Sequence, residues 1–257
     1  MPTLLLIVVA NVASTAVSLA LAALLSFRLL SGLVDRMVHV SIGLLLATAL
    51  VNILPEALAS RLAPERLGWA VLAGILGLFL LEKATLIHHT HHHEGDGHDH
   101  AHGYDAREVG RGAYPILIAD AFHNFTDGVV IAAAFLVDLG TGIVTALAVL
   151  AHEIPHEIGD FMILLNAGFS RRRSFFFMLL SGCSAVVGGI GGYFVLASTQ
   201  ALLPYALAIA AASFVYIALS DLLPELMRRS SLRKSLPEVG FVFLGVLIAI
   251  LAMRLDR

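Results

Sequence analysis

The sequence predicts an all-α protein that crosses a membrane eight times, and its composition and the pattern of its apolar residues both indicate this. Of the 257 residues, 58% are hydrophobic and 14% are charged. Soluble domains are usually about 45 to 50% apolar and about 25% charged, so this balance excludes an ordinary soluble domain. Apolar runs of about 20 residues, the length of helix that crosses about 30 Å of hydrocarbon, also recur along the chain. We expect one transmembrane domain over residues 1–257.

The predicted spans follow one another with short connections. They cover residues 4–30, 38–59, 67–87, 113–137, 140–167, 174–197, 202–227 and 237–253. The first run is too long for the apolar core of a secretory signal and has no basic segment before it, so we interpret it as a retained span. The single cysteine, Cys183, excludes an internal disulfide and a cysteine-based metal site.

The basic residues predict the orientation, because short cytoplasmic loops hold an excess of Lys and Arg. The loops after spans 1, 3, 5 and 7 hold Arg28, Arg36, Arg107, Arg111, Arg171, Arg172, Arg173, Arg228, Arg229, Arg233 and Lys234, and the opposite side holds Arg61, Arg66, Arg254 and Arg257. This asymmetry predicts that both termini lie outside the cytoplasm.

A histidine-rich segment connects spans 3 and 4. Residues 88–102 contain eight histidines among Glu, Asp and Gly, and we predict a flexible loop over 88–112. Such a tract can bind several metal ions loosely and changes charge near neutral pH. An engineered tag is the alternative, but tags are seldom internal or interrupted by Thr, Glu and Asp. With the predicted orientation, this loop is cytoplasmic.

Two polar clusters interrupt spans 4 and 5. Residues 120–128 read DAFHNFTDG, and residues 152–160 read HEIPHEIGD. An ionisable side chain at bilayer depth costs about 2.5 kcal/mol or more, so it normally faces a bundle interior or a wet path. These residues are therefore the leading functional candidates.

Helical spacing places each cluster on one stripe of its helix. The first stripe holds Asp120, His123, Asn124 and Asp127, and the second holds His152, Glu153, His156, Glu157 and Asp160. The short connection makes the two helices antiparallel neighbours. Facing imidazoles and carboxylates suit zinc or another first-row divalent cation.

Pro155 lies within the second stripe and has no N–H group. It leaves the carbonyl of Ala151 without its helical partner, which is tolerated at membrane depth where the carbonyl is buried in protein or lines a cavity. Loosened helices beside intramembrane ligands are typical of a transport path.

Other functions fit parts of the pattern. HEIPH matches the H-E-x-x-H signature of zinc metalloproteases, in which Glu153 would be the general base. The proline within the motif and the second ligand-rich helix argue against a protease. A hydrogen bond between helices explains a single buried His or Asn, but not nine polar residues on two stripes.

An internal echo suggests an inverted repeat. Residues 52–58 read NILPEAL and residues 221–227 read DLLPELM, in spans that run in opposite directions. Spans 1–3 would then repeat as spans 6–8, with spans 4 and 5 between them. Pro-Glu as a simple helix terminator is the alternative.

HNFTDG followed by HEIPHEIGD resembles the paired signatures of the ZIP family of metal transporters, particularly the branch that carries HExPHE. The resemblance covers the eight spans, the His-rich loop and the two Pro-Glu endings. It implies a 3+2+3 inverted-repeat fold that moves divalent metal into the cytosol through a binuclear site between spans 4 and 5.

The resemblance also implies ligands. It places His123, Asp127, His152 and His156 around one metal, Asn124, Glu153 and His156 around a second, and Glu157 as a further candidate. Some family members complete the second position with an acid from span 6, and this chain has none there.

The implied substrate is zinc, with iron, manganese and cadmium as further candidates, and we expect neither an organic cofactor nor enzymatic activity. The expected partners are divalent metal ions, the lipid bilayer and a second copy in a homodimer, with no nucleic acid. The lack of a large extracytoplasmic domain suggests a bacterial inner membrane.

Overall fold

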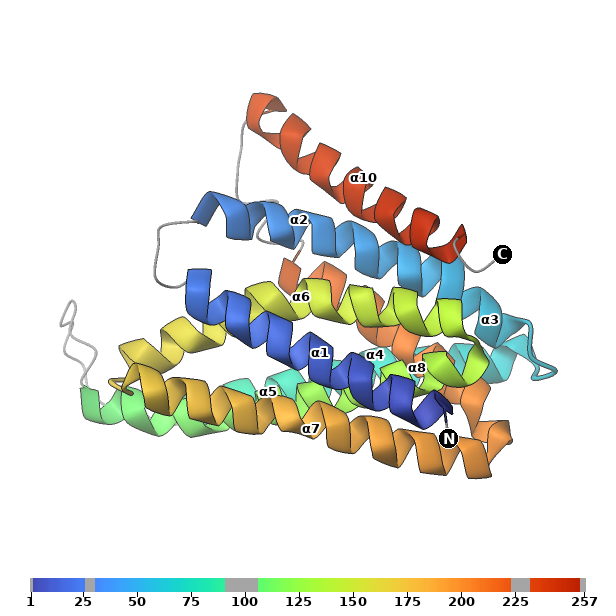
Figure 1. Ribbon diagram of the computed structural model, residues 1–257, viewed down its shortest axis with the longest axis horizontal. Coiled ribbons are helices and arrows are strands. Elements are labelled where there is room, and N and C mark those ends of the chain that lie inside the picture. The colour runs from blue at the N-terminus through green and yellow to red at the C-terminus, as the bar shows by residue number, and fades with distance from the viewer. Residues whose placement is uncertain (1, 26–30, 91–105, 223–231, 255–257) are drawn as a thin grey trace.

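The computed structural model describes residues 2–25, 31–90, 106–222 and 232–254, and every regular element in these ranges is helical. Figure 1 shows the helices as a bundle of long rods. The elements are α1 (Pro2–Leu25), α2 (Ser31–Ala47), η1 (Thr48–Ile53), α3 (Leu54–Leu58), α4 (Pro64–Thr90), α5 (Ala106–Val137), α6 (Leu139–Asn166), α7 (Arg171–Ser198), η2 (Gln200–Leu202), α8 (Leu203–Ile217), η3 (Ala218–Leu222) and α10 (Leu232–Arg254).

Within the described residues, each predicted span overlaps one helix or one run of consecutive helical elements, which confirms the all-α membrane fold. Residues 26–30 of the first span and 223–227 of the seventh lie outside the described residues. Six segments in the described ranges are long and apolar enough to cross a membrane: Pro2–Leu24, Arg36–Leu58, Ile116–Val137, Arg171–Ser198, Gln200–Ser220 and Leu236–Arg254. Helices α4 and α6 are not among these six, and α6 carries the polar cluster of residues 152–160. The chain is a multi-pass integral membrane protein.

The predicted loop over 88–112 is too wide at both ends. Helix α4 continues to Thr90, and α5 already begins at Ala106. An apolar run marks only the part of a helix that lies in the hydrocarbon of the bilayer. The helix itself continues until a residue that disfavours helix, such as Gly or Pro, ends it, so an apolar run underestimates helix length. Residues 91–105 of the predicted flexible loop lie outside the described residues.

The bundle has two ends, which we name by what lies there. Helix α1 begins and α10 ends at the terminal end, and α4 ends and α5 begins at the loop end (Figure 1). Helices α5 and α6 run in opposite directions between the two ends.

The pairs of helices that pack together are those expected of an inverted repeat, in which each contact in one half has a counterpart in the other half. Helix α2 packs against α10 as α8 packs against α4, and α1 packs against α6 as α7 packs against α5. Helix α1 packs antiparallel on α7, since Gly182 approaches Thr15 and Gly189 approaches Asn11. These pairings match a 3+2+3 arrangement with α5 and α6 between the repeats.

The two Pro-Glu segments also share a local structure. A π-helical stretch, η1, ends two residues before Pro55, and a second one, η3, begins three residues before Asp221. The chain stays helical through Pro55 into α3, so in this repeat Pro-Glu follows a π segment rather than ending the helix. Residues 223–231 lie outside the described part of the chain.

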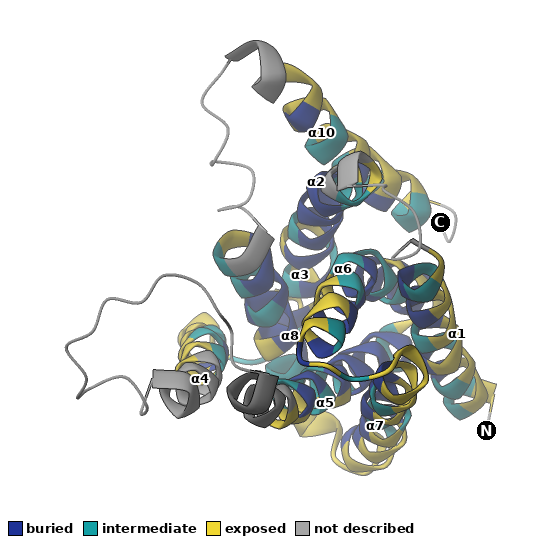
Figure 2. Ribbon diagram, turned by 90° about the vertical axis from the view of Figure 1, so that its left-hand side faces the viewer, coloured by how far each residue is buried: buried dark blue, intermediate teal, exposed yellow. Residues whose placement is uncertain are grey.

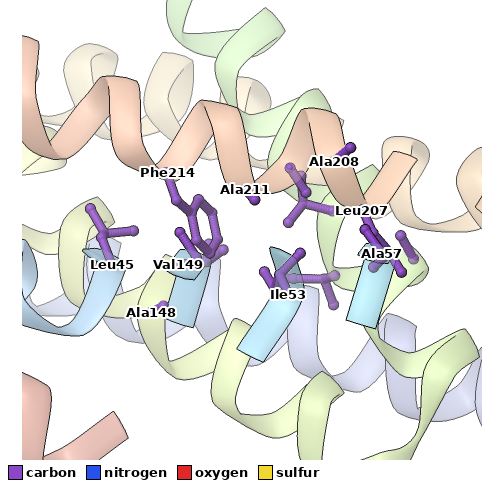
Figure 3. Packing of buried hydrophobic residues seen from close by; sticks show 14 of the residues in the cluster. Leu45, Ile53, Ala57, Ala148, Val149, Leu207, Ala208, Ala211 and Phe214 are labelled. Carbon is purple, nitrogen blue, oxygen red and sulfur yellow. The ribbon is translucent and has the colours of Figure 1, made fainter. Parts of the chain in front are cut away.

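Apolar side chains fill the space between α2, α6 and α8. Figure 3 shows this core, to which α2 and its extension contribute Leu45, Ile53 and Ala57, α6 contributes Ala148 and Val149, and α8 contributes Leu207, Ala208, Ala211 and Phe214. Figure 2 shows buried residues on the inner sides of the helices and exposed residues on the outer sides. Many exposed residues are large and apolar, as expected for helices that face lipid.

Candidate metal centre

The connection between α5 and α6 makes their polar stripes face each other. Only Asp138 separates the two helices, and its side chain accepts a hydrogen bond from the backbone N–H of Thr141 at 2.7 Å. The hydroxyl of Thr141 donates to the other oxygen of Asp138 at 2.9 Å. A carboxylate at this position satisfies one of the free N–H groups that begin every helix. The cap thus fixes where α6 starts relative to the end of α5.

Four residues from the facing stripes form a compact group, which we call the four-residue cluster. It consists of His123 and Asp127 on α5 and His152 and Glu153 on α6, and one ligand atom from each lies within 4.8 Å of all the others. Asp127, His152 and Glu153 are buried.

The atoms of this cluster are spaced like the ligands of one tetrahedral ion. His152 Nε2 lies 3.2 Å from His123 Nε2 and 3.1 Å from Asp127 Oδ2. Glu153 Oε1 lies 3.3 Å from His123 Nε2 and 3.6 Å from His152 Nε2, and His123 Nε2 lies 3.8 Å from Asp127 Oδ2. Bonds of about 2.0 to 2.2 Å to a tetrahedral zinc separate its ligands by about 3.3 to 3.6 Å. These five separations lie within about half an ångström of that spacing, and the ligand oxygens of Asp127 and Glu153 lie within 4.8 Å of each other, so the four atoms could hold one divalent ion.

Hydrogen bonding fixes the orientation of His152. Its Nδ1 lies 3.0 Å from the carbonyl oxygen of Ala148, which can only accept, so Nδ1 carries the proton. In the neutral ring Nε2 then presents its lone pair to the cluster. Metal-binding histidines commonly donate their other nitrogen to a carbonyl in this way.

A second group lies beside the first, and we call it the three-residue cluster. It consists of Asp120 on α5 with His156 and Asp160 on α6, again with one ligand atom of each within 4.8 Å of the others. The ring of His156 stacks on that of His123, with centroids 5.2 Å apart and planes inclined by 20°. The two clusters are thus in direct contact.

Comparison with known proteins places this chain. The family model described as "ZIP Zinc transporter" matches residues 86–253, which include both clusters. The chain belongs to the ZIP zinc transporter family.

Individual relatives agree with the family match. The chain is 42% identical to "Zinc transporter foi" of Drosophila melanogaster over 52% of its own length and 19% of that protein. It is 43% identical to "Metal cation symporter ZIP14" of Bos taurus, over 46% of this chain and 24% of that protein. It is 39% identical to "Zinc transporter ZIP10" of Homo sapiens, over 54% and 17%. The matched region thus spans a quarter or less of each relative.

Two readings of the sequence find no support among these ZIP relatives. All three are named as transporters or symporters, and this gives the metalloprotease alternative no support. All three come from animals, so they give no support to a bacterial inner membrane. Any helix that presents two histidines on one face can space them four residues apart, so the HExxH pattern alone does not identify a protease.

The structure regroups the predicted ligands. His123, Asp127 and His152 come together as the ZIP resemblance implies, but Glu153 completes their cluster and His156 lies with the two aspartates. Helix α6 turns His152 Nε2 inward, whereas Nδ1 of His156 faces Asp120 and Asp160. The ligand set implied by the resemblance left out both aspartates, although helical spacing had already placed Asp120 and Asp160 on the two polar stripes.

Asn124 and Glu157 have other surroundings. The Asn124 amide donates to Asp120 Oδ1 at 2.9 Å and to the Asp120 carbonyl at 3.1 Å, so it orients an acid of the three-residue cluster. Glu157 is buried, belongs to neither cluster, and neither of its carboxylate oxygens has a hydrogen-bond partner among the described residues.

The sixth predicted span is α7, and its serines form hydrogen bonds with the backbone of α5. The Ser184 hydroxyl donates to the Ala121 carbonyl, and the Ser181 hydroxyl donates to the Leu117 carbonyl at 3.5 Å. These two hydrogen bonds connect α7 to α5, the helix that carries His123 and Asp127.

The carbonyl freed by Pro155 belongs to Ala151, which is half-buried and lines a cavity of about 350 Å³ together with Ser41. Ser41 on α2 donates its hydroxyl hydrogen to Ala151 O. The neighbouring helix thus supplies the hydrogen bond that the proline removes.

Apolar side chains lie on both sides of the two clusters. Toward the terminal end, Ile131 on α5 and Val149 on α6 belong to the apolar core, whose Phe214 makes a T-shaped contact with His152 at a centroid distance of 6.2 Å. Farther along α8, Leu207 of the same core lines a cavity of about 480 Å³ that also contains Glu56 and Gln200. The His156 side chain is 41% exposed, while Leu117, Phe161 and Leu164 belong to a second buried apolar cluster on the loop-end side of Asp120 and Asp160.

Proposed function

We propose that this chain transports divalent metal ions, zinc above all, into the cytosol through the four-residue cluster. One observation carries the proposal: two imidazoles and two carboxylates from facing helices lie at the spacing of a single tetrahedral ion. Names of relatives, which include zinc transporters and a metal cation symporter, support the same substrate class.

The ligand chemistry favours zinc and leaves room for other metals. Imidazole suits zinc, iron and copper, and carboxylate extends the range toward manganese. Iron, manganese and cadmium are therefore competing substrates in this proposal. Neutral histidines next to two acids bind an ion firmly enough to replace its hydration yet carry less charge than a ring of carboxylates, which favours release.

We infer the direction of transport from the distribution of charge. Arg36 and the run 171–173 lie at the loop end. The positive-inside rule then makes the loop end cytoplasmic and places both termini outside the cytoplasm. The ion would then leave the cluster toward the loop end.

Zinc flux into proteoliposomes tests the proposal. The full chain is reconstituted with a zinc-sensitive dye inside the vesicles, and wild type is compared with His123→Ala/His152→Ala. Removal of two ligands should lower the initial rate at least about 10-fold. Loss of a group that only hydrogen-bonds to a metal ligand already costs about that much.

The matched control is Asp138→Asn, which removes a carboxylate from the same helix pair but keeps a good helix cap. It should transport at nearly the wild-type rate. Unchanged flux in the double variant, with the protein folded and inserted, would show that the ion takes another route.

A further inference from the structure

We propose that Asp120, His156 and Asp160 form a second divalent-cation position, on the loop-end side of the four-residue cluster. This ligand set differs from the one implied by family resemblance, which pairs His156 with Asn124 and Glu153. The proposal concerns ion binding, and only its role in transport rests on the proposed function.

Helix direction places the three-residue cluster nearer the loop end. Helix α5 runs away from that end, so Asp120 precedes His123 by three residues, or about 4.5 Å along the axis. Helix α6 runs toward it, so His156 and Asp160 follow His152 by about 6 and 12 Å. The second position therefore lies about one helical turn farther along the same crevice.

The ligand atoms of the three-residue cluster converge. His156 Nδ1 lies 3.8 Å from Asp120 Oδ1 and 3.6 Å from Asp160 Oδ2. These separations are close to the roughly 3.3 to 3.6 Å expected between ligands of a tetrahedral ion. Water can complete the coordination, because His156 is partly exposed.

The two acids are buried without adequate partners. Asp120 is 3% exposed and Asp160 is 8% exposed. Asp120 Oδ2 and Asp160 Oδ2 have no hydrogen-bond partner among the described residues, since Asn124 donates to the other oxygen of Asp120. A buried carboxylate without a donor or a cation is costly, so these oxygens point to a bound positive charge.

The His156 ring alone does not supply that charge well. Its Nδ1 is more than 3.5 Å from both carboxylates, which is beyond a hydrogen bond. One imidazolium could in any case balance only one of the two acids. A divalent cation between the three side chains would contact all of them at once.

The position suggests a use in the transport path. One face of the His156 ring stacks on His123, and its Nδ1 faces the two aspartates. An ion that leaves the four-residue cluster toward the loop end meets His156 next. We infer that the three-residue cluster receives it before release.

Manganese binding to the full chain in nanodiscs tests the second position. Mn²⁺ is detected by electron paramagnetic resonance. It is chosen because it prefers carboxylate ligands to imidazole, which reduces its binding to the histidine-rich segment. Wild type is compared with Asp160→Asn, which keeps the shape of the side chain and breaks no hydrogen bond given for it in the structure. The matched control is again Asp138→Asn.

Asp160→Asn should bind one Mn²⁺ fewer than wild type, and the control should bind the same number. His152→Gln should lose a different ion, so the double variant His152→Gln/Asp160→Asn should lose two. If Asp160→Asn has lost the fold, Asp120→Asn in the same comparison decides. Wild-type stoichiometry in a folded Asp160→Asn or Asp120→Asn chain would overturn the second position.

Zinc flux of the same preparations separates the two proposals. One ion fewer together with slower flux supports both the position and its role after the four-residue cluster. One ion fewer with wild-type flux keeps the position and overturns the role. Absence of flux in the wild type would overturn the proposed function, and the manganese count would still decide the site.

Discussion

Ser41 is a small side chain on α2 that completes the hydrogen bonding of another helix. Its hydroxyl reaches the Ala151 carbonyl, the group that Pro155 leaves without a partner. The same hydroxyl also lies 2.8 Å from the Met37 carbonyl of its own helix. In Ser41→Ala the Ala151 carbonyl loses its donor from α2, and membrane proteins lose about 0.6 kcal/mol on average for such a contact. We expect a lower thermal midpoint in detergent.

Ser213→Ala is the matched control, because the Ser213 hydroxyl donates only within α8, to the Ile209 carbonyl. It should change the midpoint less than Ser41→Ala does. Equal midpoints for the two variants would mean that the contact between α2 and α6 adds nothing to stability.

At the residue scale, helical spacing predicted the polar stripes, and the structure shows that they face each other. Spacing alone could not show which atoms meet. The grouping of Glu153 with the first cluster and of His156 with the aspartates depends on side-chain rotation and on the contacts of each ring, such as the bond from His152 to Ala148. These are set by tertiary packing, which a one-dimensional pattern does not contain.

Helices α5 and α7 approach so closely that their backbones touch. A Cβ at Gly188 would collide with the Phe125 carbonyl, and one at Gly128 would collide with the Ala185 carbonyl. Gly188→Ala must push the two helices apart, and overpacking of this kind typically costs about 1 to 3 kcal/mol. We expect a clearly lower thermal midpoint and slower zinc flux, because α5 carries His123 and Asp127.

Gly191→Ala provides the control, since a Cβ there meets nothing within 4 Å. Alanine is the better helix former by about 1 kcal/mol, so this variant should be as stable as wild type or more stable. A Gly188→Ala protein as stable as Gly191→Ala would contradict the close packing of α5 on α7.

At the element scale, the sequence predicted where the spans lie, because about 20 apolar residues are needed whatever the fold. The π segments η1 and η3 were not predicted. A π stretch differs from an α-helix by one residue per turn, and no propensity of Thr48 or Ala218 distinguishes the two. The echo between residues 52–58 and 221–227 did point to these places.

The whole molecule has a direction, because its two ends differ in charge. In intact cells, with Cys183→Ala as background, Ala63→Cys lies at the terminal end and Arg172→Cys at the loop end, both on exposed residues. A membrane-impermeant maleimide should label the first without permeabilisation and the second only after it. The reverse result would invert the orientation and with it the direction of transport.

The inverted repeat is also a property of the whole molecule. The exchange of packing partners between α2–α10 and α8–α4 could not be predicted from a seven-residue echo, since it requires contacts between distant parts of the chain. It explains why α5 and α6 lie at the centre, where a crevice between two similar halves can open to either side.

X-ray absorption at the zinc edge of the metal-loaded chain tests most directly whether α5 and α6 share an ion. The histidine-rich segment is a second source of imidazole, so the spectrum of His123→Ala/His152→Ala is subtracted from that of wild type at one zinc per chain. We expect the difference to show two imidazole nitrogens and two oxygens at about 2.0 to 2.2 Å. Identical spectra from the two proteins would contradict the account.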